Sequence, residues 1–275
     1  MAGNGLSRGT RWNCGILAGD MNTATPLATT LVALSLLTGC ASQNTRDGVD
    51  AMPVDPVQIA TFQQQAIGAC TQALVVVGRE RSHYARAWLV ERAAVDKPWA
   101  LARGPFPASV GAAGFAPLWQ KQEGDKKTPT GAFSITETFG SDPEFKPRLP
   151  YKVVTSDDAW CEDPNSPHYN QWITGAEAQQ ATDRLAREDD LYVHAAVIDY
   201  NRWPIVVGAG SAIFLHKSDP DGAGTLGCVG LARGPLDEML LAFDPQRMPH
   251  IIMGEDAALK QLLPAPPPRK RNRHP

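Results

Sequence analysis

Between residues 72 and 254, glycine and proline divide the chain into short apolar runs, and this division limits the possible folds more than any other feature. The sequence contains 24 Gly and 23 Pro among 275 residues, which disfavours long uninterrupted helices. The runs between them are rich in β-branched and aromatic residues, as strands are. We therefore predict a mainly β fold with a few short helices. The predicted strands cover residues 74–77, 87–90, 132–136, 192–198, 211–215 and 251–253.

Two segments have the pattern of a helix instead. Thr174 and Glu177 have capping-box spacing, and they precede residues 178–187, which contain neither Gly nor Pro. In residues 235–243, Pro235 stands in the first turn and an apolar stripe follows it. These patterns predict helices over residues 178–187 and 235–243.

The N-terminal region has the features of an export signal. Residues 27–37 form an apolar run too short to span a bilayer, and residues 37–40 (Leu-Thr-Gly-Cys) resemble the lipobox of bacterial lipoproteins. An ordinary signal peptide or a buried helix would also contain such a run. We expect a signal peptide over residues 1–39 and lipidation of Cys40, which would hold the exported protein on a membrane of the cell envelope. Because no Asp follows Cys40, we expect the periplasmic face of the outer membrane if the organism has two membranes.

The chain around the predicted β domain has a different composition. Residues 40–71 begin with a polar stretch that includes Pro53 and Pro56, and they are interpreted as the lipidated cysteine and a linker. Residues 72–254 form the predicted folded domain. Residues 255–275 end in a Pro-rich, basic sequence with little to bury, so we expect a disordered tail. Either Met1 or Met21 could be the start of synthesis.

Charge and cysteine spacing exclude several classes of function. The formal net charge is −3 and the pI is about 6.1, so the chain lacks the basic surface that nucleic-acid binding requires. Five cysteines occur, and no two of them form a C-x-x-C pair. We therefore expect neither a nucleic-acid partner nor a metal site.

The segment 213–231 contains the residues best suited to catalysis. A predicted strand ends near His216, a Gly-rich loop follows, and Cys228 comes directly after Gly227. A thiolate is the attacking form of cysteine, and a neighbouring imidazolium lowers the pKa of the thiol. The glycine allows the backbone to approach a substrate carbonyl, so the N–H groups of Gly227 and Cys228 could stabilise an oxyanion. A buried structural cysteine with an ordinary histidine is the alternative interpretation.

Four separated motifs carry a resemblance to a known family. His216, followed by Thr225-Leu226-Gly227-Cys228, resembles the signature of the L,D-transpeptidase (YkuD-type) catalytic domain. Residues 123–133 (Glu-Gly-Asp-Lys-Lys-Thr-Pro-Thr-Gly-Ala-Phe) are similar to a hairpin of that family. Residues 160–164 (Trp-Cys-Glu-Asp-Pro) and residues 169–170 (Tyr-Asn) are similar to motifs of one of its subgroups. The ordered resemblance runs from about residue 72 to residue 254.

The resemblance implies a β-sandwich-like domain that acts on peptidoglycan stem peptides without a cofactor. The nucleophile, Cys228, would attack the bond between the third and fourth residues of a stem tetrapeptide, with His216 as base and then acid. An amine of another stem would then resolve the acyl-enzyme, forming or remodelling a cross-link. Carbapenems, which acylate the cysteine of this family, are the expected inhibitors. The substrate-cleft candidates are Thr225, Trp160, His168, Tyr169 and Arg233.

Two positions depart from the pattern of the family. Many members have His between Ser/Thr and Gly and have Arg two residues beyond the cysteine, whereas this chain has Leu226 and Gly230. Arg233 is a candidate replacement for that arginine. An L,D-carboxypeptidase, an enzyme that attaches or detaches wall proteins, and a catalytically silent wall-binding lipoprotein are the alternative functions.

The remaining candidates have structural interpretations. His194 lies within a predicted strand and is interpreted as structural. Residues 219–222 are interpreted as a turn, because they lack the later ligands of a calcium loop. After removal of the signal and lipidation of Cys40, three cysteines remain in an oxidising compartment. Because catalysis needs one free thiol, we predict a disulfide between Cys70 and Cys161.

Overall fold

The computed structural model describes residues 53–181, 183–218 and 222–261. The predicted signal peptide, Cys40, most of the predicted turn at 219–222 and residues 262–275 of the predicted tail lie outside these ranges. Among the described residues, no helix is long and apolar enough to cross a membrane.

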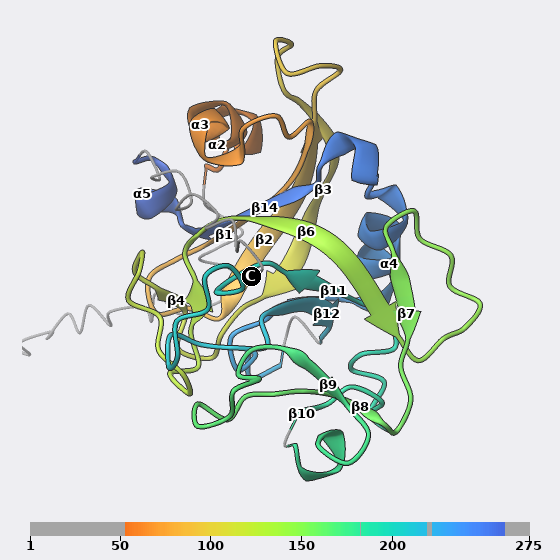
Figure 1. The fold of residues 1–275 in the computed structure, drawn as a ribbon. Helices are drawn as coiled ribbons and strands as arrows, with labels where there is room; N and C mark the ends of the chain where they lie inside the picture. The colour runs from red at the N-terminus through yellow and green to blue at the C-terminus, as the bar shows by residue number, and fades with distance from the viewer. Residues whose placement is uncertain (1–52, 182, 219–221, 262–275) are drawn as a thin grey trace, which may run out of the picture. The chain divides into compact units, whose positions relative to one another are not determined.

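The described chain is built around one large β-sheet, as Figure 1 shows. The strand order is β11-β12-β13-β3-β2-β1-β14-β6-β7, and an additional pairing of β11 with β6 closes the sheet on itself. A three-stranded sheet, β10-β8-β9, and a two-stranded sheet, β4-β5, complete the strands. The prediction of a mainly β fold is therefore confirmed. The strands are β1 (Gln72–Gly78), β2 (Tyr84–Glu91), β3 (Ala100–Ser109), β4 (Phe115–Ala116), β5 (Thr128–Pro129), β6 (Gly131–Gly140), β7 (Tyr151–Val153), β8 (Asp158–Trp160), β9 (Trp172–Thr174), β10 (Asp183–Arg184), β11 (Ala195–Ile198), β12 (Phe214–Lys217), β13 (Val229–Leu231) and β14 (His250–Glu255).

Each predicted run overlaps an observed strand, whereas β3 and several short strands were not predicted. Residues 192–198 and 211–215 enter β11 and β12 only near their ends. In β3, Pro105 and Pro107 interrupt the apolar pattern. They are tolerated because β3 pairs with β13 only through Ala108 and Ser109, so the prolines lie where one edge of β3 is unpaired.

One of the two predicted helices is wrong. Residues 178–187 contain only the short 3₁₀ helix η1 (Ala178–Gln180), and the chain then enters β10, where Asp183 pairs with Trp160 of β8. Pairing with β8 and burial of Leu185 override the local helical pattern. The other helix is confirmed as α4 (Arg233–Ala242), two residues earlier at its start than predicted.

The segment interpreted as a linker is helical in its second half. Helices α2 (Pro56–Phe62) and α3 (Gln64–Ile67) pack Ile59 and Ile67 against one side of β1 and β14. Asp55 caps α2, accepting hydrogen bonds from the N–H groups of Val57 and Gln58. Similarly, α5 (Asp256–Leu259) begins inside the predicted tail and buries Leu259. Both segments are ordered because their few apolar side chains have a sheet to cover.

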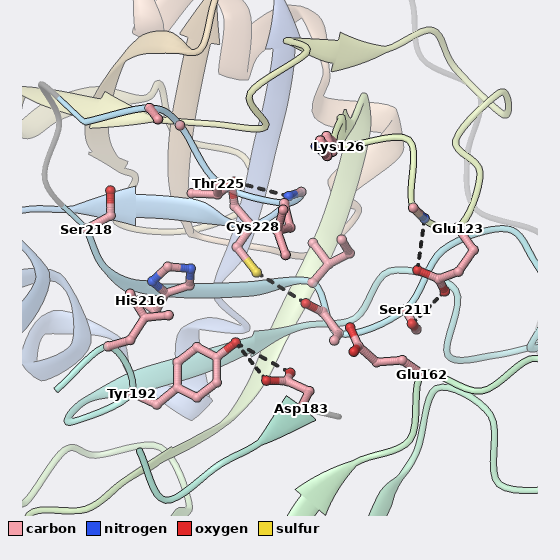
Figure 2. Close-up of a pocket in the computed structure, with 18 of the residues that line it drawn as sticks. Glu123, Lys126, Glu162, Asp183, Tyr192, Ser211, His216, Ser218, Thr225 and Cys228 are labelled. Carbon is pink, nitrogen blue, oxygen red and sulfur yellow. Dashed lines mark hydrogen bonds between the residues drawn. The ribbon is translucent and has the colours of Figure 1, made fainter. Parts of the chain in front are cut away.

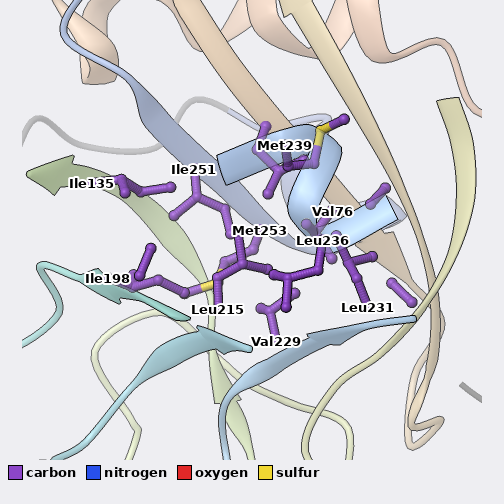
Figure 3. Close-up of a cluster of buried hydrophobic side chains, with 14 of the residues drawn as sticks. Val76, Ile135, Ile198, Leu215, Val229, Leu231, Leu236, Met239, Ile251 and Met253 are labelled. Carbon is purple, nitrogen blue, oxygen red and sulfur yellow. The ribbon is translucent and has the colours of Figure 1, made fainter. Parts of the chain in front are cut away.

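One face of helix α4 packs into the interior of the domain. Figure 3 shows its side chains facing strands from opposite parts of the closed sheet, β1 and β14 on one side and β12 and β13 on the other. All of these side chains belong to one buried cluster, which we call the interior cluster. The residues labelled in Figure 3 are Val76, Ile135, Ile198, Leu215, Val229, Leu231, Leu236, Met239, Ile251 and Met253.

Candidate active site

Two parallel strands bring His216 and Cys228 together. His216 lies on β12, and Cys228 immediately precedes β13, which pairs with β12 in parallel with Leu215 opposite Val229. Side chains alternate along a strand, so Leu215 and Val229 enter the interior cluster while Cys228 faces the opposite side. Figure 2 shows the imidazole of His216 beside the sulfur of Cys228.

Both residues line a cavity of about 800 Å³. Of the other residues proposed for the site, Gly227 and Thr225 also line it. Charged side chains that the motifs did not identify surround the same space, and the apolar side chain of Leu226 is exposed at its edge. The charged lining residues are Lys121, Glu123, Lys126, Glu162, Asp183 and Arg187.

The thiol of Cys228 is held in its neutral form. Burial raises the pKa of Cys228 to about 12, although the N–H of Phe214, 3.4 Å from Sγ, opposes the shift. The S–H donates to the carbonyl oxygen of Ala212 at 3.2 Å. The low-dielectric surroundings favour the neutral thiol. A base must therefore remove the thiol proton before the sulfur can attack.

The imidazole of His216 is placed to be that base. Its Nδ1 lies 2.6 Å from the carbonyl oxygen of Lys217, which can only accept, so Nδ1 carries the proton and Nε2 keeps a free lone pair. Burial lowers the pKa of His216 to about 4. The ring of Tyr192 packs edge-on against the imidazole, with 5.4 Å between ring centroids.

These protonation states correct one expectation from the sequence. An imidazolium beside the thiol was expected to lower its pKa, but burial favours the neutral form of both groups. In the described residues, no hydrogen bond joins His216 to Cys228. The geometry suits a neutral imidazole that removes the thiol proton during attack, as a general base does.

Thr225 stabilises the turn that precedes β13 and contains Cys228. Its Oγ1 donates to the carbonyl oxygen of Cys228 at 2.7 Å and accepts the N–H of Gly227 at 3.1 Å. A second threonine, Thr128 of the 123–133 hairpin, donates to the same carbonyl at 3.2 Å. The expectation that the Gly227 N–H is an oxyanion donor is therefore wrong for this conformation, because that N–H is already bonded. The N–H of Cys228 is the better candidate.

Gly227 is required for steric reasons. Its φ is +151°, and a Cβ at this position would lie 3.1 Å from both Ile213 Cδ1 and the carbonyl oxygen of Lys127. Gly230, where many family members have arginine, is also confined, since a Cβ there would overlap the side chain of Ser218.

Trp160 and Tyr169 were predicted to line the cleft, but both are buried beneath it. Asn170 Oδ1 accepts from Trp160 Nε1 at 2.9 Å and from the Ala212 N–H at 3.1 Å. Tyr169 accepts the N–H of Gly210 at 3.0 Å. The Trp-Cys-x-Asp-Pro and Tyr-Asn motifs therefore hold the segment 210–212 in place. In this segment, the carbonyl oxygen of Ala212 accepts a hydrogen bond from the thiol of Cys228. Trp160, Tyr169 and Asn170 thus position the site and are not among the described residues that line the cavity, whereas Glu162 of the first motif does line it.

Two further cleft candidates lie outside the cavity. His168 is exposed and contacts Glu177, with 2.6 Å between Nδ1 and Oε1. Arg233 forms an ion pair with Asp237 of its own helix, with 2.7 Å between Nε and Oδ2. Arg233 therefore does not replace the missing arginine, and the cavity instead has Lys121, Lys126 and Arg187.

His194 has a structural role, as predicted. It is buried, and its Nδ1 lies 2.5 Å from Asp237 Oδ1. Its ring stacks on the ring of Phe145, with 3.6 Å between the ring centroids. Its Nε2 lies 3.3 Å from Asp142 Oδ2. These contacts tie β11 to α4 and to the loop before β7.

The predicted disulfide is not formed. Cys70, Cys161 and Cys228 are all free. Cys70 packs beneath α2 and α3, whereas Cys161 belongs to a separate small cluster near β8 and β9. Burial in different clusters, and not pairing, protects these two thiols. Among the described residues, no group of three or more His, Cys, Asp or Glu side chains could hold a metal ion.

The charged residues of the cavity were not predicted, because they come from loops and from strand β10, which lie apart in the sequence. Glu162 follows Trp160-Cys161 within a recognised motif, and Lys121 and Lys126 flank or occupy the 123–133 hairpin. The sequence therefore shows the motifs in or beside which these residues occur, but it does not show that their side chains line the cavity. Asp183 and Arg187 lay in the segment mistaken for a helix, so only the observed fold shows that they face Cys228.

The structure thus shows a β-rich domain in which a buried thiol and a buried imidazole line one cavity. The family of the L,D-transpeptidase catalytic domain (YkuD) matches residues 87–244, more than half of the chain. The protein belongs to this family.

Two solved structures are similar to this chain. One is the helical cell shape determining protein Pgp2 from Campylobacter jejuni, with 15% identity, a TM-score of 0.34, and coverage of 73% of this chain and 56% of that one. The other is a mutant of the same protein, with 14% identity, a TM-score of 0.35, and coverage of 78% and 55%. This chain thus spans about half the length of those proteins. No curated protein matches the sequence significantly.

Proposed function

We propose that this protein is an active L,D-transpeptidase that forms or remodels peptidoglycan cross-links through a thioester on Cys228. The observation that carries the proposal is the arrangement of the thiol and the base. Cys228 is presented by a turn that two threonines hold, beside a His216 whose free lone pair is on Nε2. Such an arrangement supports acyl transfer through a covalent intermediate.

The proposed reaction has two halves. In the first, His216 Nε2 removes the proton of Cys228 as Sγ attacks the carbonyl carbon of the third residue of a stem tetrapeptide. The carbon–nitrogen bond to the fourth residue breaks, His216 gives its proton to the leaving amine, and a thioester remains. In the second half, an amine attacks the thioester, the carbon–sulfur bond breaks, and the sulfur recovers a proton through His216.

Intact-mass spectrometry of the full chain with a stem tetrapeptide tests this proposal. We expect an adduct equal to the peptide minus its fourth residue, located on the peptide that contains Cys228. A carbapenem should add its own mass at the same position. Cys161→Ala should label like the wild type, since Cys161 lies outside the cavity. A wild-type protein that forms neither adduct, or forms them at Cys70 or Cys161, would contradict the proposal.

The lipobox-like sequence supports a further proposal, that Cys40 is lipidated and anchors the protein in the cell envelope, at the periplasmic face of the outer membrane where two membranes exist. Detergent partitioning of the expressed protein tests it. Wild type should enter the detergent phase and Cys40→Ser should not. Equal partitioning and equal processing of the two proteins would contradict the anchor.

A further inference from the structure

Asp183 places a buried carboxyl group in the cavity that contains Cys228. Asp183 lies on β10, lines the cavity, and has only 9% of its side chain exposed. Buried carboxylates are normally neutralised by a close cation or by several short hydrogen bonds. Among the described residues, Asp183 has no cation closer than 3.9 Å and no side-chain hydrogen bond shorter than 3.3 Å.

The contacts that Asp183 makes among the described residues are long. Its two oxygens lie 3.3 and 3.4 Å from the hydroxyl of Tyr192, whereas a strong O–H···O⁻ bond is about 2.5–2.7 Å. Arg187 Nη1 is 3.9 Å away, because the guanidinium is engaged by Asp189, with 2.6 Å between Nη2 and Oδ2. Burial, followed by the negative charge of Glu162, raises the pKa of Asp183 to about 7. The described residues around Asp183 therefore neutralise its carboxylate only weakly.

This negative region lies next to the reacting groups. Tyr192, which contacts Asp183 through its hydroxyl, packs its ring on His216. Figure 2 shows Asp183, Glu162 and Tyr192 on one side of Cys228 and Lys126 on the other. The cavity lining thus contains both signs of charge, with Glu162 and Arg187 near Asp183, and a cation that entered the cavity would be attracted toward the two carboxylates.

We propose that Asp183, with Glu162 beside it, binds the protonated amine of the acyl acceptor and so selects an amine over water in the second half of the reaction. This inference rests on the proposed function. The ammonium would give one proton to the Asp183 carboxylate, and the resulting neutral amine would attack the thioester carbon. As the carbon–sulfur bond breaks, the second proton lost by the nitrogen passes through His216 to the sulfur, and Asp183 returns its proton to solvent.

Asp183→Asn tests the proposal, because it removes the charge while keeping the shape. The full chain is acylated with a stem tetrapeptide, a second stem peptide with a free side-chain amine is added, and the ratio of cross-linked dimer to hydrolysed tripeptide is measured. We expect this ratio to fall at least about tenfold, the usual scale for losing a buried charge partner. Acylation should be unchanged or faster, since the charge of Asp183 raises the pKa of Cys228.

Two controls make the result specific. Asp157→Asn makes the same change at an exposed position outside the cavity and should leave the ratio at its wild-type value. Hydroxylamine, which is uncharged near neutral pH, should attack the acyl-enzyme of Asp183→Asn as fast as that of wild type. An unchanged dimer-to-tripeptide ratio in Asp183→Asn would overturn the inference, whereas a wild type that is not acylated would instead overturn the proposed function.

A measurement on wild type keeps the test decisive if Asp183→Asn does not fold. An acceptor peptide with a trimethylated side-chain amine keeps its positive charge but cannot attack, and an acetylated one is neutral. The trimethylated peptide should inhibit cross-linking and the acetylated one should not. Equal inhibition by the two peptides would overturn the inference.

Discussion

The two faces of strands β12 and β13 contact different kinds of side chain. On the inner side, Leu215, Val229 and Leu231 pack against α4 in an interior of aliphatic side chains. On the outer side, Phe214 and Cys228 lie among aromatic rings, next to the polar and charged groups of the cavity. The inner side supplies burial, which stabilises the fold in proportion to the apolar area removed from water. The outer side keeps polar groups in low dielectric, where their charge states are shifted.

From this difference we expect that substitutions only a few residues apart can change either the free energy of unfolding or the rate of the reaction, each without the other. Leu231 and Cys228 are three positions apart and both are buried. The loss of Leu231 should affect folding, whereas the loss of Cys228 should affect the reaction. The following predictions test that separation.

The largest expected effect is that of Cys228→Ala on activity. Turnover of a stem tetrapeptide should fall on the order of 10⁴-fold or more, as when a covalent nucleophile is removed. The free energy of unfolding in urea should change by no more than about 1 kcal/mol, because only one sulfur atom is lost. Residual turnover near the wild-type rate, or collapse of the fold, would contradict the separation of the two sides.

His216→Ala should lower the rate of acylation by about 10²- to 10⁴-fold, the usual contribution of a general base. The pH profile of wild type sharpens the test. Burial lowers the pKa of His216 from 6.5 to about 4, so the neutral, basic form persists as pH falls through 6.5. The acylation rate should therefore decline only as pH approaches about 4. A wild-type profile that falls with a midpoint near 6.5 would show that His216 is not held neutral.

The same shift has a consequence for stability. The unfolded chain takes up a proton on His216 near pH 6.5, but the folded chain does so only near pH 4. Stability from this group is thus present above pH 6.5 and is lost as pH falls between these values. Urea unfolding from pH 7 to pH 4 should show a smaller loss in His216→Ala than in wild type.

On the inner side, Leu231→Ala should lower the free energy of unfolding by about 2–5 kcal/mol, the range for large-to-small substitutions in a core. The matched control is Leu226→Ala, since Leu226 is 77% exposed at the edge of the cavity. That variant should change stability by no more than about 0.5 kcal/mol. Similar urea midpoints for the two variants would show that burial does not distinguish the two positions.

The smallest expected effect is that of Thr225→Ala. It removes the hydroxyl that bonds the Cys228 carbonyl and the Gly227 N–H, which should cost about 1–3 kcal/mol of stability. Acylation should slow about tenfold, because the turn presents the nucleophile less well. Thr225→Ser keeps the hydroxyl and should restore both properties, whereas equal defects in the two variants would point to the lost methyl group.

The sequence predicted secondary structure correctly where the pattern within one segment is enough to decide between strand and helix. The runs that became β1, β2, β6 and β14 have their apolar pattern in the sequence itself, and α4 has both its proline start and its apolar stripe. Sequence was a poor guide where a distant partner decides. Residues 178–187 have helical composition, yet pairing of β10 with β8 draws Asp183 into a strand.

The family motifs, the mainly β character and the choice of Cys228 and His216 as candidates could be read from the sequence, because these depend on short patterns of residue types. The chemical environment of those residues depends on the tertiary structure. The fold buries both groups and so shifts both toward their neutral forms, it buries Trp160 and Tyr169 beneath the cavity, and it places Asp183 in the cavity that Cys228 lines. Burial and proximity arise between segments far apart in the chain, and no local pattern records them.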